Sequence, residues 1–142
     1  MSDHHVHDSL LLDGPLWKRP GDARRWVIAR CAEANLVLDG NDLPLLVSEL
    51  VTNACVHGAD PITIRLDTNS TRVRVEVEDN SPDDLPEVRR PSGRDAQGRG
   101  LLIVESLSHL WGTERTPTGK VVWAVVPVRA DGINARYQAG SA

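Results

Sequence analysis

Residues 45–58 read LLVSELVTNACVHG, and this stretch decides the fold. Its apolar side chains recur every three or four positions, which is the spacing of a helix that packs one face into a core. They are Leu46, Val47, Leu50, Val51, Ala54 and Cys55. Glu49 and Asn53 interrupt this pattern four positions apart, so a helix places both side chains on one face, and His57 extends the row. A stripe facing solvent and a functional site both explain this row, and the rest of the chain has to decide between them.

The length and composition predict one domain without a membrane-spanning segment. A chain of 142 residues can bury a core without disulfides. No run approaches the roughly 20 apolar residues that cross a bilayer. The first residues lack the basic and apolar regions of a signal peptide, so we expect a cytoplasmic protein that does not bind a membrane. Cys31 and Cys55 lie in apolar helical patterns, which favours free buried thiols.

The charge distribution argues against direct nucleic-acid binding. The formal net charge is -4, and the basic residues form no block. Almost all of them are arginines, with Lys18 and Lys120 as the two lysines, a usage typical of GC-rich bacterial genes. His4, His5 and His7 form a cluster that metal ions can bind, but histidine-rich termini are often incidental, so we expect no native metal site there.

The first half of the chain predicts one strand and two helices between flexible or turning segments. Residues 1–8 are expected to form a flexible tail, and 9–128 the folded domain. Residues 9–13 predict an edge strand before the Gly14-Pro15 turn. A first helix is expected to run from Asp22, after a Pro20-Gly21 breaker, to Asn35. The helix quoted above should follow the turn at 39–42 and end at His57, with Gly58 as a left-handed terminator.

The second half predicts two pairs of strands around a long loop and a helix. Alternating patterns at 61–67 and 72–79, joined by 68–71, predict an antiparallel hairpin. Residues 80–97 are rich in proline and charge, which indicates a functional or disordered loop. A helix at 101–110, strands at 111–116 and 120–128, and a flexible tail at 129–142 follow. This order predicts an α/β two-layer sandwich with helices on one face of a mixed, mostly antiparallel sheet.

Three polar features fall where an element ends or turns, and together they are the parts of an ATP site. Gly98 and Gly100 precede a helix, where a phosphate can approach the free N–H groups. Asp79 ends a strand and can accept a hydrogen bond from an exocyclic amine. Asn53 can ligate Mg²⁺ through its carbonyl oxygen. Glu49, one turn away, can take the proton of an attacking hydroxyl or water.

Two other nucleotide motifs are excluded. The sequence GRGL at 98–101 lacks the third glycine of a dinucleotide-binding fingerprint, and it follows a loop where that fingerprint follows a strand. It also lacks the lysine and the serine or threonine that end a P-loop.

Three segments resemble the N, G1 and G2 boxes of the GHKL (histidine-kinase-like) ATPases, namely SELVTNA at 48–54, VEDNSP at 77–82 and GRGLLIV at 98–104. The similarity extends over residues 20 to 128 and is greatest to the small anti-sigma-factor serine/threonine protein kinases. The resemblance implies the Bergerat fold of these ATPases, with ATP and Mg²⁺ as cofactors. It also implies that Glu49 is the catalytic base and Asn53 the Mg²⁺ ligand.

The resemblance further implies a nucleotide-binding set and a lid. The lid would be 80–97, and Asp79 would bind the adenine amino group. The nucleotide-binding residues that it implies are Asn53, Asp79, Asn80, Gly98, Arg99, Gly100 and Leu101. His57 is expected to be structural, at the helix end, rather than a contact of the lid.

The resemblance also implies partners. Proteins of this group regulate transcription: they sequester a sigma factor and phosphorylate a serine or threonine of a small antagonist protein of the STAS type, and they resemble homodimers. One departure favours an alternative. Asp79 is followed by Asn80, Ser81 and Pro82 where the fuller G1 pattern has glycines, which indicates a stiffer lid. The alternative is a nucleotide-binding module with little or no kinase activity that acts by partner capture. A phosphorelay module that phosphorylates itself on histidine is disfavoured, because no long dimerisation helix precedes the domain.

Overall fold

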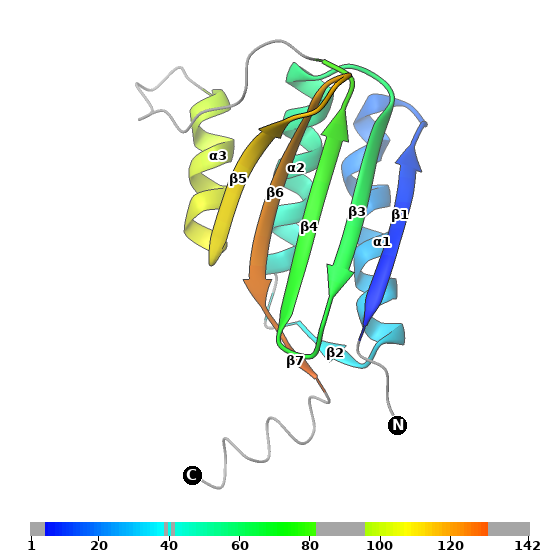
Figure 1. Ribbon diagram of the computed structural model, residues 1–142, viewed down its shortest axis with the longest axis vertical. Helices are drawn as coiled ribbons and strands as arrows, with labels where there is room; N and C mark the ends of the chain where they lie inside the picture. The colour runs from blue at the N-terminus through cyan, green and yellow to red at the C-terminus, as the bar shows by residue number, and fades with distance from the viewer. Residues whose placement is uncertain (1–4, 39, 41, 82–95, 131–142) are drawn as a thin grey trace, which may run out of the picture.

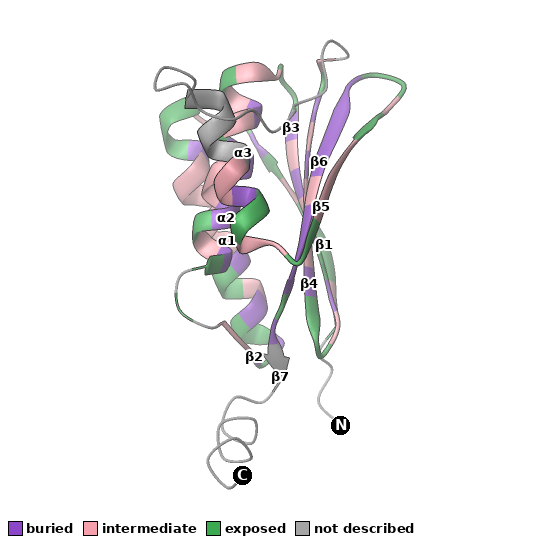
Figure 2. Cartoon of the chain, turned by 90° about the vertical axis from the view of Figure 1, so that its left-hand side faces the viewer, coloured by how far each residue is buried: buried purple, intermediate pink, exposed green. Residues whose placement is uncertain are grey.

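This computed structural model describes residues 5–38, 40, 42–81 and 96–130, which form two layers (Figure 1). One layer is a five-stranded sheet in the order β1-β3-β4-β6-β5, in which all neighbouring strands are antiparallel. Its strands are β1 (Val6–Leu12), β3 (Ile62–Thr68), β4 (Arg72–Asp79), β5 (Leu110–Arg115) and β6 (Lys120–Pro127). The other layer contains helices α1 (Arg19–Glu33), α2 (Asp42–His57) and α3 (Ala96–Leu107). All three helices cover one face of the sheet, so the predicted two-layer sandwich is confirmed (Figure 2).

The core lies between the helix layer and the covered face of the sheet. Helix α2 contributes most to it from the helix side, because Leu46, Val47, Leu50 and Val51 are almost fully buried. Alternate residues of the strands face them, as the period of two requires. These are Ile62, Ile64, Leu66, Val73, Val75, Val77, Val122, Ala124 and Val126. Since a buried Val, Leu or Ile stabilises the fold by about 1.5–3 kcal/mol, this apolar contact holds the two layers together.

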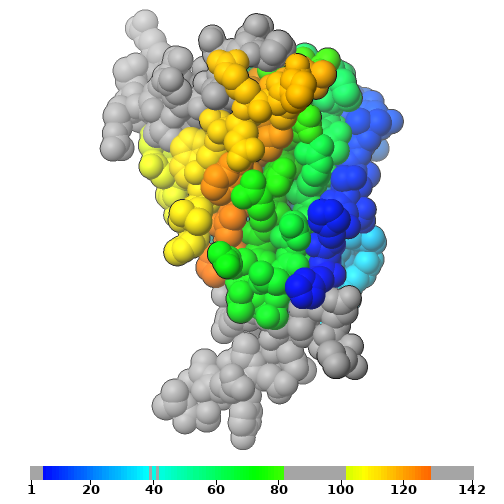
Figure 3. Space-filling view, in the orientation of Figure 1, coloured from blue at the N-terminus to red at the C-terminus, as the bar shows by residue number. Residues whose placement is uncertain are grey.

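The opposite face of the sheet is not covered by a helix (Figure 3). It carries charged side chains that pair across strands, among them Arg65 with Glu78. The guanidinium of Arg74 lies 4.3 Å from the centre of the Trp123 ring. Gly112, the cross-strand partner of Trp123, leaves room for that ring, because a Cβ there would lie 2.7 Å from it. Ion pairs and the contact between Arg74 and Trp123 therefore occupy much of this face.

The N-terminal elements begin earlier than the sequence predicts. β1 starts at Val6, whose N–H donates to Thr68 Oγ1 at 2.8 Å, so 6–8 belong to the sheet and their assignment to a flexible tail was wrong. As predicted, β1 is an edge strand. A 3-10 turn at Leu16–Lys18 leads directly into α1, which begins at Arg19. Pro20 lies in the first turn of this helix, where its missing N–H costs nothing, so it does not act as a breaker.

Three further boundaries differ from the prediction. α1 ends at Glu33, two residues before Asn35, which has a φ of 58°. α3 spans Ala96–Leu107, so it starts and ends earlier than the predicted 101–110, and Leu110 belongs to β5. α2 ends at His57 as predicted, but Gly58 is not in the left-handed region, so its predicted role as a left-handed terminator was wrong.

A second, two-stranded sheet was not predicted. It pairs β2 (Leu36–Val37), which follows α1, with β7 (Arg129–Ala130), which follows β6. Residues 129 and 130 therefore do not belong to a flexible tail. The other segments predicted to be flexible, 1–4 and 131–142, and most of the predicted lid, 82–95, lie outside the described residues.

Two general properties of the described chain are the state of its cysteines and the character of its helices. Cys31 and Cys55 are free thiols, and burial raises the pKa of Cys31 to about 11, which keeps that thiol protonated. None of the helices in the described part of the chain has the length and apolar character needed to span a membrane.

Candidate functional site

Four elements meet at one end of the molecule, where Asp79, Asn80 and the glycine-containing segment lie, while Asn53 and Glu49 lie further along α2. α2 ends at His57 and β4 ends at Asp79, while β6 starts at Lys120 and α3 starts at Ala96 (Figure 1). In antiparallel neighbours such as β4 and β6, the end of one strand adjoins the start of the next, and Asp79 is the cross-strand partner of Lys120. The fold therefore brings together segments that are far apart in the sequence.

The polar row on α2 lies at the boundary between the core and the surface. Leu45, Thr52 and Val56 form the solvent-facing side of the helix and are exposed. Glu49 and Asn53 are half-buried instead. A simple solvent-facing stripe would be as exposed as Thr52, so the row is not such a stripe, and its function stays a prediction. Because a helix rises 1.5 Å per residue, Asn53 lies about 6 Å and Glu49 about 12 Å from His57 along the axis.

The environment of Glu49 suits a proton acceptor. Desolvation by burial raises the pKa of this carboxyl above its ordinary value of 4.5. No ion pair with another described residue offsets this effect. A carboxylate that is poorly solvated and unpaired accepts a proton more readily than one in bulk water, which is the property that a general base requires.

Asp79 is held in place by two donors. It continues the inward-facing row of Val73, Val75 and Val77, and only 2% of its surface is exposed. Its Oδ1 accepts a hydrogen bond from the Ser81 N–H at 2.8 Å and lies 3.2 Å from Lys120 Nζ. A carboxylate at this depth is costly without such partners, and the lysine supplies the opposite charge.

Lys120 is the functional candidate that the sequence prediction missed. Its side chain is 3% exposed, and its Nζ lies 3.5 Å from the His57 carbonyl oxygen as well as close to Asp79. A signal was present in the sequence: Lys120 has the same strand parity as Val122 and Ala124, which face the core. A lysine on the apolar side of a strand has to meet a partner inside, and Asp79 on the neighbouring strand is that partner.

Gly58 and Gly119 leave room for Asp79, which forms the ion pair with Lys120. A Cβ on Gly58 would lie 2.4 Å from Cγ of Asp79, and a Cβ on Gly119 would lie 1.9 Å from the Asp79 carbonyl oxygen. Both distances are shorter than real Cβ contacts allow. Glycine is therefore required at the two positions because the backbone approaches Asp79 so closely.

The segment after Asp79 is attached to the domain by hydrogen bonds. The Asn80 N–H donates to the Ala59 carbonyl at 2.8 Å, while the Asn80 side chain is exposed. Together with the bond from the Ser81 N–H to Asp79, this contact fixes the first two residues of the predicted lid. The missing glycines predict a stiff start to the lid, and these two hydrogen bonds are consistent with that prediction, which stays untested for the rest of the segment.

The glycine-containing segment lies in the first turns of α3. Gly98, Arg99, Gly100 and Leu101 are helical rather than placed before the helix. The first N–H groups of a helix lack partners within it and can bind an anion. The role of this segment in phosphate binding stays a prediction, since the side chains of 96–101 lie outside the described part of the structure.

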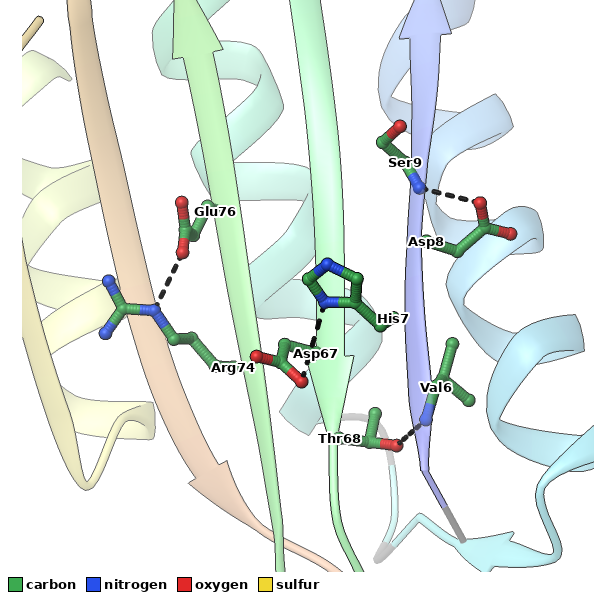
Figure 4. Close-up of polar contacts among 8 residues, drawn as sticks. All are labelled: Val6, His7, Asp8, Ser9, Asp67, Thr68, Arg74 and Glu76. Atoms are coloured by element: carbon green, nitrogen blue, oxygen red, sulfur yellow. Dashed lines mark hydrogen bonds and ion pairs between the residues drawn. The ribbon is translucent and has the colours of Figure 1, made fainter. Parts of the chain in front are cut away.

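A hollow on the open face of the sheet is a less suitable site (Figure 4). Its charged groups are paired with each other: His7 Nδ1 lies 3.9 Å from Asp67, and Arg74 donates to Glu76 at 2.9 Å. None of the described residues forms a group of three or more His, Cys, Asp and Glu side chains that could hold a metal ion. Of the predicted histidine cluster, His4 lies outside the described residues.

The residues at the α2 end fit a magnesium-bound nucleotide. Asp79 provides an acceptor near the end of α2, and Asn53 and Glu49 follow at one and two turns from it. Mg²⁺ commonly takes one or two protein oxygens and completes its coordination with phosphates and water, so a single amide oxygen from Asn53 suffices.

Comparison with known proteins agrees with this geometry. The family model described as a histidine kinase-like ATPase domain matches residues 22–126. This span contains Glu49, Asn53, Asp79 and Lys120, together with the first turns of α3. No match was found among curated proteins.

Proposed function

The chain belongs to the histidine kinase-like ATPase domain family, and from this premise we propose that it is an ATP-binding regulator of the anti-sigma-factor type. In this proposal it phosphorylates a serine or threonine of an antagonist protein and sequesters a sigma factor. The observation that carries the kinase activity is the half-buried pair of Glu49 and Asn53, one turn apart on α2. Neither side chain belongs to the apolar core, and both have the chemistry that phosphoryl transfer requires.

Each residue has a role in the proposed mechanism. Magnesium-bound ATP would supply the phosphoryl group, and ADP would be the leaving group. The amide oxygen of Asn53 would hold the metal, and the carboxylate of Asp79 would accept a hydrogen bond from the base. The N–H groups at the start of α3 would hold the phosphates, and Glu49 would accept the proton of the substrate hydroxyl. The raised pKa of Glu49 supports this last role, because a stronger base takes up the proton more easily in the transition state.

The test is phosphate transfer from ATP to candidate antagonist proteins by the wild type and by Glu49→Ala. We expect the variant to lose transfer by about a hundredfold or more, because it lacks the base. Glu33→Ala is a matched control, since this glutamate is exposed in the last turn of α1, outside the elements that form the site. Equal transfer by wild type and Glu49→Ala would remove Glu49 from the proposal.

The altered start of the lid supports a second candidate function, a nucleotide-binding module that acts by partner capture alone. The hydrogen bonds of Asn80 and Ser81 to the domain favour it, because they restrict the hinge that a closing lid needs. A pull-down from native extract with and without Mg-ATP separates the two candidates. Capture of a sigma factor with no transfer to any co-purified protein favours the module, and transfer to a captured antagonist favours the kinase.

A further inference from the structure

The buried ion pair between Asp79 and Lys120 has a consequence for which base the site accepts. Both side chains are almost fully buried, and the ammonium lies 3.2 Å from Oδ1 of the carboxylate. Oδ1 also accepts the Ser81 N–H. One oxygen of the carboxylate is therefore used by the protein itself, and any base has to be recognised by the other oxygen.

The position of Lys120 is fixed by more than this one contact. Its Nζ lies 3.5 Å from the carbonyl oxygen of His57, at the carboxyl end of α2. The last carbonyls of a helix carry partial negative charge, so this end stabilises a nearby cation. Gly119 allows the turn before β6 to approach the backbone of Asp79 and Asn80 closely. The ammonium of Lys120 is thus held beside Asp79 by its contacts with the carboxylate and with the end of α2.

The charge of Lys120 decides what Asp79 can do. An ionised carboxylate only accepts hydrogen bonds, whereas a neutral carboxylic acid both donates and accepts. An ammonium within reach of a carboxylate oxygen donates a charge-assisted hydrogen bond to it, and the Lys120 ammonium lies 3.2 Å from Oδ1. With Lys120 in place, the group presents an acceptor only, which matches an exocyclic amine and rejects a carbonyl oxygen.

We propose that Lys120 is a specificity-determining residue, which keeps Asp79 an obligate acceptor and so makes the site select 6-aminopurine over 6-oxopurine nucleotides. This inference rests on the proposed nucleotide-binding function and adds to it the origin of base selectivity. Lys120 acts through Asp79 and is a positioning residue rather than a catalytic one. Replacing it with a neutral side chain lets the acid donate to a carbonyl oxygen, and the selectivity is lost.

The test compares ATP with inosine triphosphate (ITP), which differs from ATP by a carbonyl group and a ring N–H in place of the amine and ring nitrogen. Affinities are measured by titration calorimetry with Mg²⁺, so the readout is binding and not turnover. We expect the wild type to bind ATP at least about a hundredfold more tightly than ITP, because ITP leaves the carboxylate facing an acceptor. In Lys120→Met the preference falls to about threefold or less, because the neutral acid serves both bases.

The chain offers a matched control and a conservative variant. Lys18→Met removes the other lysine, which is exposed, and should leave the preference unchanged. Lys120→Arg keeps the charge and should retain the preference within about threefold of the wild type. Circular dichroism checks that each variant is folded. If Lys120→Met does not fold, the arginine variant decides: loss of the preference in folded Lys120→Arg overturns the proposal.

A second measurement does not depend on nucleotide. Since the chain has two lysines, acetic anhydride labelling followed by mass spectrometry reports on Lys18 and Lys120 separately. We expect Lys120 to be acetylated at least about tenfold more slowly than Lys18 in the wild type, and to lose this protection in Asp79→Asn. Equal labelling of both lysines in the wild type overturns the ion pair and the inference with it.

The outcomes separate the two proposals. If the wild type binds neither nucleotide, the proposed function fails and the inference fails with it. If the wild type prefers ATP and folded Lys120→Met keeps that preference, nucleotide binding stands and the role of Lys120 is overturned.

Discussion

The carboxyl of Glu49 binds its proton more tightly in the folded protein than in the unfolded chain, because burial raises its pKa above 4.5. The unfolding free energy therefore decreases as the pH rises through the interval between the ordinary and the raised value. We expect Glu49→Gln to be as stable as the wild type at pH 3 and more stable at pH 7. Urea denaturation at both values measures this difference. Glu114→Gln is the exposed control, and a Glu49→Gln variant less stable than the wild type at pH 7 would contradict the desolvation.

Asp60 should show the opposite pH dependence. The buried guanidinium of Arg19 donates to both of its carboxylate oxygens and, through Nε, to the Gly14 carbonyl at 2.8 Å. The hydrogen bonds from Arg19 hold the pKa of Asp60 below its ordinary value of 3.8. The resulting stabilisation is present above that value and is lost as the pH falls through the lowered one.

We therefore expect Asp60→Asn to lower the unfolding free energy at pH 7 and to approach the wild type at pH 2–3, as measured by urea denaturation across this range. Asp67→Asn is the control, because Asp67 is exposed and has only a 3.9 Å contact with His7. A constant difference between Asp60→Asn and wild type over the whole range would mean that the ion pair does not set the pKa.

Single residues were predictable where a local pattern marks them. Glu49 and Asn53 interrupt an apolar helix, and Asp79 ends a strand, so each was visible without a structure. Lys120 and Gly119 were not singled out, because their importance arises from the contact with Asp79, which is 41 positions from Lys120 in the chain. Such a contact depends on strand order, which local periodicity does not give.

The end of α2 gives a prediction about a whole element. Gly58 directly follows the last residue of this helix and lies beside the Asp79 carboxylate, so a methyl group there would collide with that carboxylate. We expect Gly58→Ala to lower the unfolding free energy by about 1–3 kcal/mol and to weaken ATP binding, because either α2 or Asp79 has to move. Denaturant unfolding and calorimetry measure the two effects.

Gly14→Ala is the matched control for this substitution, because nothing lies within 4 Å of a Cβ at that position and its φ is not positive. It should be at least as stable as the wild type. If Gly58→Ala behaves like Gly14→Ala in both measurements, the close packing of α2 against Asp79 is wrong.

The helices and the strands of the main sheet could be predicted because each carries a strong apolar period. β4 was predicted with its observed bounds, and the end of α2 was also found. The bounds that failed depend on tertiary contacts. Residues 6–8 form a strand because β3 offers a partner, and β2 and β7 exist only because they meet each other. Two-residue strands have too little sequence to show a pattern.

The two-layer arrangement as a whole predicts that nucleotide stabilises the entire domain. A ligand that binds only the folded state raises the unfolding free energy, by about 2.7 kcal/mol at a hundred times its Kd. We expect Mg-ATP at that excess to raise the Tm by several degrees, as measured by scanning fluorimetry.

The same concentration of Mg-ATP should give a much smaller shift in Asp79→Asn, whereas Asp67→Asn on the open face should respond like the wild type. Equal shifts in wild type and Asp79→Asn would mean that the base does not bind at Asp79. This result would leave the fold assignment intact and change only the location of the site.

The place of β6 in the sheet has a consequence for biosynthesis. This strand lies between β4 and β5, yet it is made after both of them. Until β6 has left the ribosome, the edges of β4 and β5 that pair with it stay open in the nascent chain. Open strand edges favour aggregation. Lys120 is the first residue of β6, and β7, which follows β6, pairs with β2. A copy synthesised only as far as β5 therefore lacks the ion pair between Asp79 and Lys120, and with it the proposed origin of base selectivity.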